Sequence, residues 1–436
     1  MEQIRFWEAQ WLGRLKSSEK ATKNRETKGI PFDQPEIPYT ALYLLGLLRE
    51  TVECDINVID LWNKGSHSVD IDTLRTISSH YDVFLFSPFT NNYSFAKQCV
   101  SEIKKINSDS ICVVGGHHAS FCAEECRMDG FDYVIAGKGE KALIELAKSS
   151  WRMDGHVLSG SDGSQDEIDY WNGIIPAYDL LPDRYRKTYY ARLFTTHGCP
   201  FNCVFCSNTV WHRKKTIFMP ISRVEQELSQ IKAKISFEEI YINDENFTLE
   251  SDHFKKVSAL MNDSCLKWGC ETRIDIVDKD KLRILATNGC NEIDYGLESL
   301  DEKVLRLSDK GINLEDAYRI FSETAENGIR SHVNLMVGLP GETKASAIRT
   351  VEVICDWIRK GIVSTVDYFV TVPYPGTALF NYHNDFGMEI HTTEWDQYRE
   401  DSHPVFNLDS MRSDEIYSCW IHGLNEFSKT IESLWR

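Results

Sequence analysis

Three cysteines within one short segment carry the clearest chemical signal in this chain. Cys199, Cys203 and Cys206 stand in a C-x3-C-x2-C spacing, with the aromatic Phe205 directly before the third cysteine. Three thiolates can hold three irons of a [4Fe–4S] cube and leave the fourth iron open, whereas a closed structural cluster takes four cysteines. The spacing therefore favours a cluster with one iron available to a substrate or cofactor.

Two other interpretations of these thiols remain open. Zinc usually takes four ligands, and the nearest additional candidates, His197 and His212, do not recreate a zinc ribbon. Unrelated buried cysteines are the second alternative. The string Thr-Thr-His-Gly-Cys-Pro-Phe-Asn-Cys-Val-Phe-Cys as a whole resembles the cluster motif of the radical SAM superfamily. In that family S-adenosylmethionine (SAM) chelates the open iron, and the reduced cluster cleaves SAM to methionine and a 5′-deoxyadenosyl radical.

Bulk composition limits the class of protein. A chain of 436 residues is too long to fold around one ordinary hydrophobic core, so we expect two or three domains. We expect a cytoplasmic protein without a membrane partner, because no apolar run approaches ~20 residues, no signal-peptide layout is present, and the thirteen cysteines show no disulfide-like framework. A net charge of −18 argues against a nucleic-acid partner. The basic string Arg213-Lys214-Lys215 is either a solvated surface or a docking site for an acidic electron donor such as flavodoxin or ferredoxin.

Residues 1–150 alternate between short apolar strands and amphipathic helices. Such alternation predicts an α/β domain with a doubly wound parallel sheet. The expected strands are Glu2–Trp7, Asp55–Trp62, Val83–Ser87, Ile111–Gly116 and Tyr133–Ala136, and the expected helices are Tyr39–Glu50, Tyr93–Ile106 and Glu140–Lys148. A Gly-, Ser- and Asp-rich stretch then predicts a linker over residues 151–185.

Parallel sheets bind ligands at the carboxyl ends of their strands. Glycine there lets the backbone approach a bulky ligand, although such glycines are also common in ordinary turns. The loops that follow three of the expected strands resemble, together and in this order, the cobalamin-binding domain that precedes many radical SAM domains. The resemblance implies cobalamin contacts from Ser87, Asn91, Gly115, Gly116, His117, Gly137, Gly139 and Glu140. No Asp-x-His-x-x-Gly motif is present to supply a histidine below cobalt, so His117 and His118 are interpreted as loop residues that contact a ligand or solvent.

Residues 186–385 resume the alternation with six strand–helix units, which predicts a partial (β/α)6 TIM-type barrel. The expected strands are Tyr190–Thr196, Glu239–Ile242, Trp268–Thr272, Glu292–Gly296, Val333–Val337 and Tyr368–Thr371. The expected helices include Ser222–Lys234, Asp278–Thr287, Leu314–Glu326 and Lys344–Arg359. We expect a short helical cap over residues 386–436.

Polar residues recur where the barrel strands should end. Any one of them suits a helix cap, but their repetition at successive strand ends favours a shared ligand. The resemblance to radical SAM domains implies that Asp244 and Glu245 contact the SAM amino group, that Arg273 pairs with its carboxylate, and that Glu298 bonds the ribose hydroxyls. It also implies that backbone near Phe205 and Leu339 meets the adenine.

The resemblance implies a reaction class. The preferred hypothesis is methylation of an unactivated carbon in a small-molecule or natural-product precursor, through a 5′-deoxyadenosyl radical and methylcobalamin. One alternative keeps the radical for rearrangement, cyclisation, epimerisation or dehydration, with cobalamin assisting or absent. A second alternative is a corrinoid- or cluster-binding protein without turnover.

Overall fold

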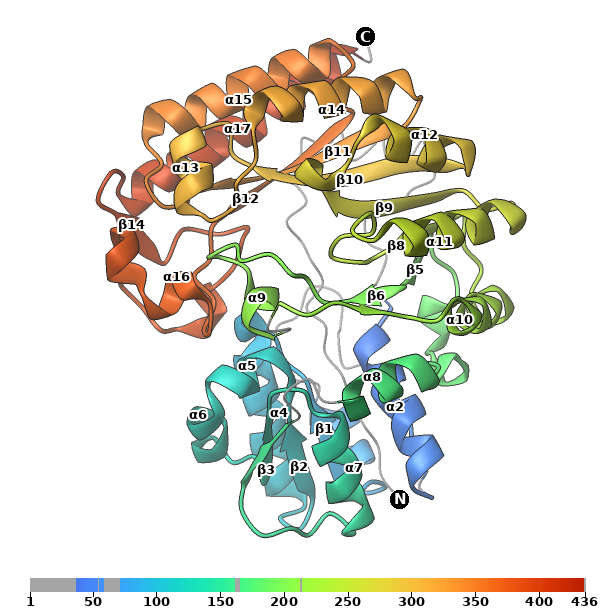
Figure 1. Ribbon diagram of the computed structural model, residues 1–436. Helices are drawn as coiled ribbons and strands as arrows, with labels where there is room; N and C mark the ends of the chain where they lie inside the picture. The colour runs from blue at the N-terminus through green and yellow to red at the C-terminus, as the bar shows by residue number, and fades with distance from the viewer. Residues whose placement is uncertain (1–36, 54, 59–70, 161–164, 212–213, 435–436) are drawn as a thin grey trace. The chain divides into compact units, whose positions relative to one another are not determined.

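The computed structural model describes residues 37–53, 55–58, 71–160, 165–211 and 214–434 of the 436-residue chain. These residues form two compact units (Figure 1). In the described part, the first unit contains residues 37–187 together with 226–236, and the second contains residues 188–225 together with 237–434. The strand expected at Glu2–Trp7 lies outside the described residues, as does the second half of the one expected at Asp55–Trp62.

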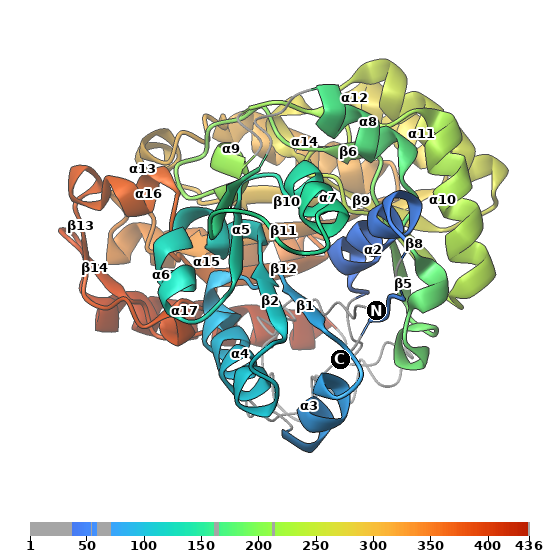
Figure 2. The same cartoon turned by 90° about the horizontal axis from the view of Figure 1, so that it is seen from below.

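The first unit contains a parallel sheet of four described strands in the order β1-β2-β3-β4, of which Figure 2 shows β1 and β2 side by side. The strands are β1 (Val83–Phe86), β2 (Ile111–Val114), β3 (Tyr133–Ala136) and β4 (Val157–Ser159). The surrounding helices are α2 (Tyr39–Thr51), α3 (Ile71–Ser78), η1 (Thr90–Asn92), α4 (Tyr93–Ile106), α5 (Gly116–Phe121), α6 (Ala123–Met128), α7 (Glu140–Lys148), α8 (Gln165–Gly173), η2 (Tyr178–Leu180) and η3 (Asp183–Tyr185). Every residue of β1 is buried, as expected for a parallel strand covered on both faces.

The segment 151–185, expected as a linker, is part of this unit. β4 pairs in parallel with β3, with Val134 opposite Val157. In α8, Trp171 stacks on Tyr43 of α2 with 4.2 Å between ring centroids. A three-residue strand inside a Gly- and Ser-rich stretch offers too little hydrophobic pattern to reveal itself in the sequence.

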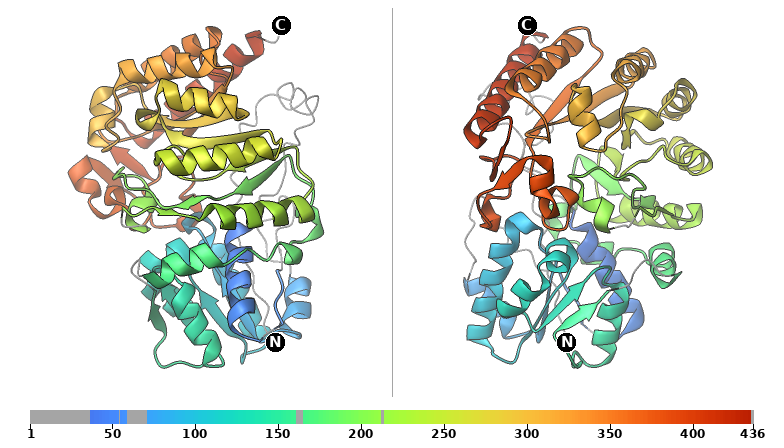
Figure 3. Two further views of the ribbon diagram at one scale, coloured as in Figure 1. Left: turned by 45° about the vertical axis from the view of Figure 1, so that its right-hand side comes forward. Right: turned by 60° about the vertical axis from the view of Figure 1, so that its left-hand side comes forward.

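The second unit contains a curled parallel sheet of six strands in the order β12-β11-β10-β9-β8-β5, which is the chain order read backwards. The strands are β5 (Tyr190–Leu193), β8 (Glu239–Ile242), β9 (Trp268–Arg273), β10 (Cys290–Glu298), β11 (Arg330–Val337) and β12 (Thr365–Val370). The helices are α11 (Ser251–Asp263), η4 (Ile274–Ile276), α12 (Lys279–Thr287), α13 (Glu302–Leu307), α14 (Leu314–Glu326) and α15 (Lys344–Arg359). The helix α10 (Ile221–Lys234) is divided between the units, with residues 221–225 in the second and 226–234 in the first. Figure 3 shows α11, α12, α14 and α15 side by side along the outer face of the sheet. The partial barrel predicted from the sequence is confirmed.

Local sequence explains why these helices begin where they do. The side chains of Asp278, Asn313 and Thr343 each accept a hydrogen bond from a backbone N–H in the first turn of α12, α14 and α15. Each such cap is worth about 1 kcal/mol of helix stability. The helix ends are thereby held at fixed points, so the strand-end loops that precede the helices keep a defined geometry.

The C-terminal residues add a helix and a small sheet to the second unit. The long helix α17 (Ser413–Leu434) packs against α15 and β12, and Trp420 donates its indole N–H to the carbonyl of Tyr368 at 2.8 Å. The short elements are α16 (Ala378–Asn381), η5 (His383–Phe386), η6 (Trp395–Gln397) and the antiparallel pair β13 (Met388–Ile390) and β14 (Phe406–Leu408). The expected helical cap is therefore present, with a two-stranded sheet that the sequence did not reveal. No helix among the described residues combines the length and apolar character needed to cross a bilayer.

Candidate functional site

The three cysteines lie on one loop of the second unit, which runs from β6 (Thr196–His197) to the helix α9 (Ser207–Trp211). The strand β7 (Ile217–Phe218) follows α9 and pairs with β6 in antiparallel fashion. Two distant segments hold this loop at its centre. The Val204 N–H donates to the carbonyl of Ser308 at 3.1 Å, and the Val204 carbonyl accepts from the Leu379 N–H at 3.0 Å. The loop is therefore fixed by the turn after α13 and by the start of α16.

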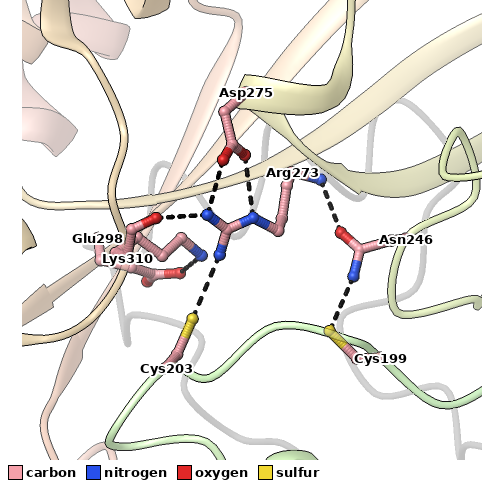
Figure 4. A network of polar contacts seen from close by, with 7 residues as sticks. All are labelled: Cys199, Cys203, Asn246, Arg273, Asp275, Glu298 and Lys310. Atoms are coloured by element: carbon pink, nitrogen blue, oxygen red, sulfur yellow. Dashed lines mark hydrogen bonds and ion pairs between the residues drawn. The ribbon is translucent and has the colours of Figure 1, made fainter. Parts of the chain in front are cut away.

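Two side chains donate hydrogen bonds to the sulfur atoms of this loop (Figure 4). The Arg273 Nη1 lies 3.2 Å from the Cys203 Sγ, and the Asn246 Nδ2 lies 3.1 Å from the Cys199 Sγ. The two donors are themselves connected, because the Asn246 Oδ1 accepts the backbone N–H of Arg273 at 3.1 Å. Asn246 was not among the site residues expected from the sequence, although it stands two residues after Asp244 in the same strand-end string.

The guanidinium of Arg273 is surrounded by partners. It forms a two-pronged pair with Asp275, with N–O distances of 2.9 and 2.8 Å, and it also donates to the carbonyl of Lys310. The guanidinium carbon Cζ lies 3.9 Å from the ring centroid of Phe201, which is a cation–π contact. The structure thus places Arg273 against the cysteine loop, and the SAM-carboxylate contact implied for it stays a prediction.

Glu298 and Lys310 form a buried ion pair beside this network. Their Oε1 and Nζ atoms are 2.8 Å apart, and both side chains are at most 10% exposed. Burial alone would lower the pKa of the Lys310 ammonium, but Glu298 and Cys203 raise it above its ordinary value. Glu298 lies at a register shift at the end of β10 with φ of 69°, a strained conformation of the kind that concentrates at functional sites.

The two acidic residues after β8, Asp244 and Glu245, accept hydrogen bonds from residues in and just before the cysteine loop. Both carboxylate oxygens of the fully buried Asp244 accept hydrogen bonds from Thr195 and Thr196, at 2.5 to 2.9 Å. Burial raises the pKa of Asp244 to about 6 in spite of these bonds. The Glu245 carboxylate accepts the backbone N–H of Gly198 at 3.1 Å. The Asp244 Oδ1 thus accepts the backbone N–H groups of Thr195 and Thr196, and its Oδ2 accepts the Thr195 hydroxyl, while the SAM contacts implied for Asp244 and Glu245 stay predictions.

The residues expected near adenine lie on different parts of this unit. Phe205 is half-buried within the cysteine loop, whereas Leu339 is fully buried after β11. Next to Leu339, Gly338 has a φ of 87° and donates its N–H to the Glu342 Oε2 at 2.6 Å. Burial raises the pKa of Glu342 to about 8, although the loop backbone lowers it.

The donor set suits an iron–sulfur cluster with one open iron. Burial raises the pKa of the Cys206 thiol to about 12 and also raises that of Cys199, and the neighbouring thiols add to both effects. Metal binding removes such protons, because iron takes the thiolate form. The other described cysteines of this unit belong to separate elements: Cys265, Cys270, Cys290, Cys355 and Cys419. Cys265 is exposed, and the others are buried.

In the first unit, backbone and small residues form the strand ends. Gly116 follows β2 with a φ of 84°, and a Cβ there would lie 2.4 Å from the Ser87 Oγ that follows β1. Ser120 connects two of these loops: its hydroxyl donates to the Gly116 carbonyl at 2.7 Å and accepts the Gly137 N–H at 2.8 Å. Gly115 lies in extended backbone next to Ile135.

The remaining residues expected at cobalamin also follow strand ends. Gly139 precedes α7, and Glu140 is the buried first residue of that helix. Among the described residues, the buried Oδ1 of Asn91 and both amide atoms of Asn92 have no hydrogen-bond partner. A glycine-lined edge with unsatisfied amides fits a large ligand that is itself rich in amides, as the corrin periphery is.

One of the two histidines of this region, His118, differs from its expected role, whereas the contact implied for the partly exposed His117 stays a prediction. His118 is fully buried in α5, stacks on Tyr93 at 4.1 Å between centroids, and bonds the Thr90 hydroxyl through Nδ1 at 3.2 Å. Burial, followed by the neighbouring His117, lowers the pKa of His118 to about 3, so its ring is neutral. His118 is thus a core residue and not a solvent-contacting loop residue, because α5 begins at Gly116 and turns this position inward.

Two protein families match these two units in sequence. Residues 193–354 match the radical SAM superfamily, and residues 30–147 match the B12-binding domain. The chain is a cobalamin-binding radical SAM enzyme. Its cofactors are a [4Fe–4S] cluster, SAM and cobalamin.

Individual relatives of this radical SAM enzyme extend over most of its length. An uncharacterised methyltransferase of Pyrococcus horikoshii is 26% identical over 407 residues, covering 87% of this chain and 85% of its own. The anaerobic magnesium-protoporphyrin IX monomethyl ester cyclase of Rubrivivax gelatinosus is 22% identical over 408 residues, covering 87% and 71%. The structure of the radical SAM methyltransferase TsrM of Kitasatospora setae, with cobalamin and a [4Fe–4S] cluster bound, has a TM-score of 0.67 at 15% identity and covers 90% of this chain and 81% of its own. This last likeness shows the fold.

The structure of this radical SAM enzyme adds residues that the motifs did not suggest. Asn246, Lys310 and Ser308 all contact or support the cysteine loop. They stand at least 40 positions after Cys206 in the chain and belong to no cysteine motif. Lys310 follows Asp309, a residue with φ of 52°, in a turn after α13. A Ser-Asp-Lys-Gly turn reads as an ordinary helix end, so only the fold reveals its role.

Proposed function

We propose that this enzyme transfers a methyl group to an unactivated carbon of a small-molecule substrate. The observation that carries the proposal is the joint presence, in one chain, of an ordered three-cysteine loop and a glycine-lined B12-binding edge. The cluster with SAM supplies a primary carbon radical, and cobalamin supplies a transferable methyl group. Other residues of the chain donate hydrogen bonds to the cysteine sulfurs, keep the cysteine loop in one conformation and bury the polar groups around it.

The chemistry of the acceptor atom supports a carbon. An oxygen, nitrogen or sulfur nucleophile can take a methyl group from SAM directly by polar displacement, because it offers a lone pair. An unactivated carbon offers none, so a radical must first replace one of its C–H bonds. Two of the three compared proteins are named methyltransferases, which favours the same reaction.

A second candidate is a radical transformation without net methylation, such as a cyclisation. The cyclase of R. gelatinosus supports this alternative, since it matches this chain over 408 residues. Both reactions begin with the same cleavage of SAM, so the residues around the cysteines do not separate them. The mass of the product does, because only methylation adds CH2.

An acidic electron donor such as flavodoxin or ferredoxin is part of the proposal. Lys214 and Lys215 are exposed a few residues after the helix α9 that follows the cysteine loop, whereas Arg213 lies outside the described residues. A cationic surface close to a cluster favours encounter with an anionic donor. Reduction by such a donor should therefore slow as ionic strength rises.

The deciding experiment is anaerobic reconstitution with iron, sulfide, cobalamin and SAM, followed by mass analysis of the SAM products. Methyl transfer predicts that both S-adenosylhomocysteine and 5′-deoxyadenosine are formed. S-adenosylhomocysteine should disappear when cobalamin is omitted. Deoxyadenosine without S-adenosylhomocysteine would favour the cyclisation class. A cluster-loaded protein that forms neither product, with and without extracts containing candidate substrates, would contradict both.

A further inference from the structure

We infer that Asn246 and Arg273 raise the reduction potential of the cluster by donating N–H···S hydrogen bonds to two of its three thiolate ligands. The inference rests on the bound [4Fe–4S] cluster and not on the identity of the substrate. It assigns to these residues a positioning and tuning role that differs from direct contact with SAM.

The geometry supplies the first argument. The Asn246 amide is 3.1 Å from the Cys199 sulfur, and the Arg273 guanidinium is 3.2 Å from the Cys203 sulfur (Figure 4). Both residues are buried, at 3% and 6% exposed. A hydrogen bond to a charged acceptor strengthens in such a low-dielectric site, because water does not compete for the donor.

The anchoring of the donors supplies the second argument. Asn246 cannot turn its amide without losing the backbone N–H of Arg273, which its Oδ1 accepts at 3.1 Å. The Arg273 fork is held by both oxygens of Asp275. Each donor is thus fixed by a bond that does not involve sulfur, so the N–H groups point at the thiolates before any cluster is reduced. Preorganised dipoles of this kind cost no reorganisation when charge arrives.

The charges around the site point to the directed N–H groups as the source of the effect. Arg273 is paired with Asp275, and Lys310 is paired with Glu298, so each cation stands next to its own anion. Net charge from these four side chains is therefore close to zero. The two N–H dipoles that point toward sulfur therefore remain as the main electrostatic contribution of these residues.

Reduction adds one electron to the cluster and increases the negative charge on its sulfur ligands. Donors that point at those sulfurs stabilise the reduced form more than the oxidised form, so they raise the potential. Cys206 differs from the other two ligands. It takes a backbone N–H from Asn208, and no side-chain donor to its sulfur occurs among the residues that the structure describes. The tuning is thus concentrated at Cys199 and Cys203.

The test is Asn246→Asp, made in the full-length enzyme and titrated anaerobically with dithionite while the reduced cluster is followed by electron paramagnetic resonance. The new carboxylate keeps an oxygen for the Arg273 N–H but replaces the donor that faces Cys199. We expect the cluster to be about tenfold harder to reduce at a given potential, which for one electron is a shift of ~59 mV to more negative values.

The matched control is Asn202→Asp, which makes the same chemical change within the cysteine loop itself. Asn202 is exposed and donates to the Asp309 carboxylate at 2.7 Å, not to a sulfur, so its substitution should move the potential far less. Arg273→Lys, which keeps the charge and loses the fork, should shift the potential in the same direction as Asn246→Asp. It also serves as the second variant if Asn246→Asp fails to load iron.

A measurement on the unmodified enzyme completes the test. Exchange from H2O into D2O should shift the iron–thiolate stretching bands in the resonance Raman spectrum, and Asn246→Asp should reduce that shift. Equal potentials for the two fully loaded aspartate variants, or an unmodified cluster insensitive to D2O, would overturn the inference. Neither result depends on methyl transfer, so failure here is distinguishable from failure of the proposed function.

Discussion

The two units of this enzyme prepare their cofactor sites by opposite means. In the barrel unit, side chains do the positioning: Arg273, Asn246 and Lys310 each have defined polar partners around the cysteine loop. In the B12-binding unit, the strand ends are lined by glycines such as Gly116, whose missing Cβ leaves room beside Ser87.

This contrast follows from the size of what each unit holds. A cluster bound by three thiolates has fixed atoms at which single N–H groups can point, so individual side chains matter. A corrin is broad, and backbone that comes close to it needs positions without side chains. Substitutions in the barrel unit should therefore act by removing a group, whereas substitutions in the other unit should act by adding one.

The largest effect should follow loss of a cluster ligand. Cys203→Ala removes one of three thiolates, so we expect loss of the bound cluster and of all deoxyadenosine formation, measured by iron content and product chromatography. Cobalamin binding by the other unit should persist. Cys265→Ser, at an exposed cysteine outside the loop, is the control and should keep the cluster. Full deoxyadenosine formation by Cys203→Ala would remove the basis of the site.

The second largest effect should come from breaking the buried ion pair. Lys310→Met leaves the Glu298 carboxylate buried without its partner 2.8 Å away, which should destabilise the barrel unit by about 3–5 kcal/mol in anaerobic denaturant unfolding. The double variant Glu298→Gln with Lys310→Met should recover much of that loss. Lys429→Met breaks an exposed pair with Glu426 and should cost at most about 1 kcal/mol. Equal losses for the two lysine variants would contradict the importance of burial.

A third effect concerns pH and the interior of the barrel. Burial lowers the pKa of His332, but Asp294 and Asp367 outweigh burial and raise it to about 9. A group whose pKa is raised on folding stabilises the protein fully below its unfolded pKa, near 6.5, and this contribution disappears as the pH rises through about 9. The contribution should be about 3 kcal/mol.

Thermal unfolding between pH 6.5 and 9.5 tests this prediction, since His332→Gln should flatten the decline of stability with pH. The Glu271 carboxyl, whose pKa is raised to about 8 by burial and by Asp294, titrates in the same range and should leave a residual slope in the variant. Parallel pH profiles for both proteins would show that His332 does not carry the dependence.

The smallest effect should appear in the B12-binding unit. Gly116→Ala adds a Cβ 2.4 Å from the Ser87 hydroxyl at a φ of 84°, and we expect cobalamin affinity to fall roughly thirtyfold, or about 2 kcal/mol. Gly155→Ala is a matched control, because its φ of 86° is similar but nothing lies within 4 Å of the added atom. Equal affinities for the two variants would indicate that the strand-end crowding does not matter, while the cluster should load normally in both.

The sequence predicted features that depend on local pattern. The bounds of α4, α7, α14 and α15 agree with the expected helices, since each has a continuous apolar stripe over more than two turns. The three cysteines also share one loop, as their spacing predicted, because they stand within eight residues of one another. Patterns this compact need no knowledge of the tertiary structure.

Features that depend on distant contacts were missed. The approach of Asn246 to Cys199 and of Lys310 to Glu298 is decided by strand order and by the turn after α13, neither of which leaves a motif. The strand β4 and the pair β13 with β14 are three residues long, too short for a period of two to be recognised. His118 was misassigned because its neighbours look like a loop until α5 is seen to begin at Gly116.

The two hydrogen bonds of Val204 constrain when the cofactor can be installed. Its partners, Ser308 and Leu379, are translated long after the cysteines, and Leu379 belongs to the segment beyond the last barrel strand. The cysteine loop therefore makes both of these contacts only after the ribosome has synthesised all six barrel strands. We therefore expect the cluster to be installed after synthesis of the barrel and not during it. Ribosome-arrested chains that end before Leu379 should accordingly fail to retain a cluster.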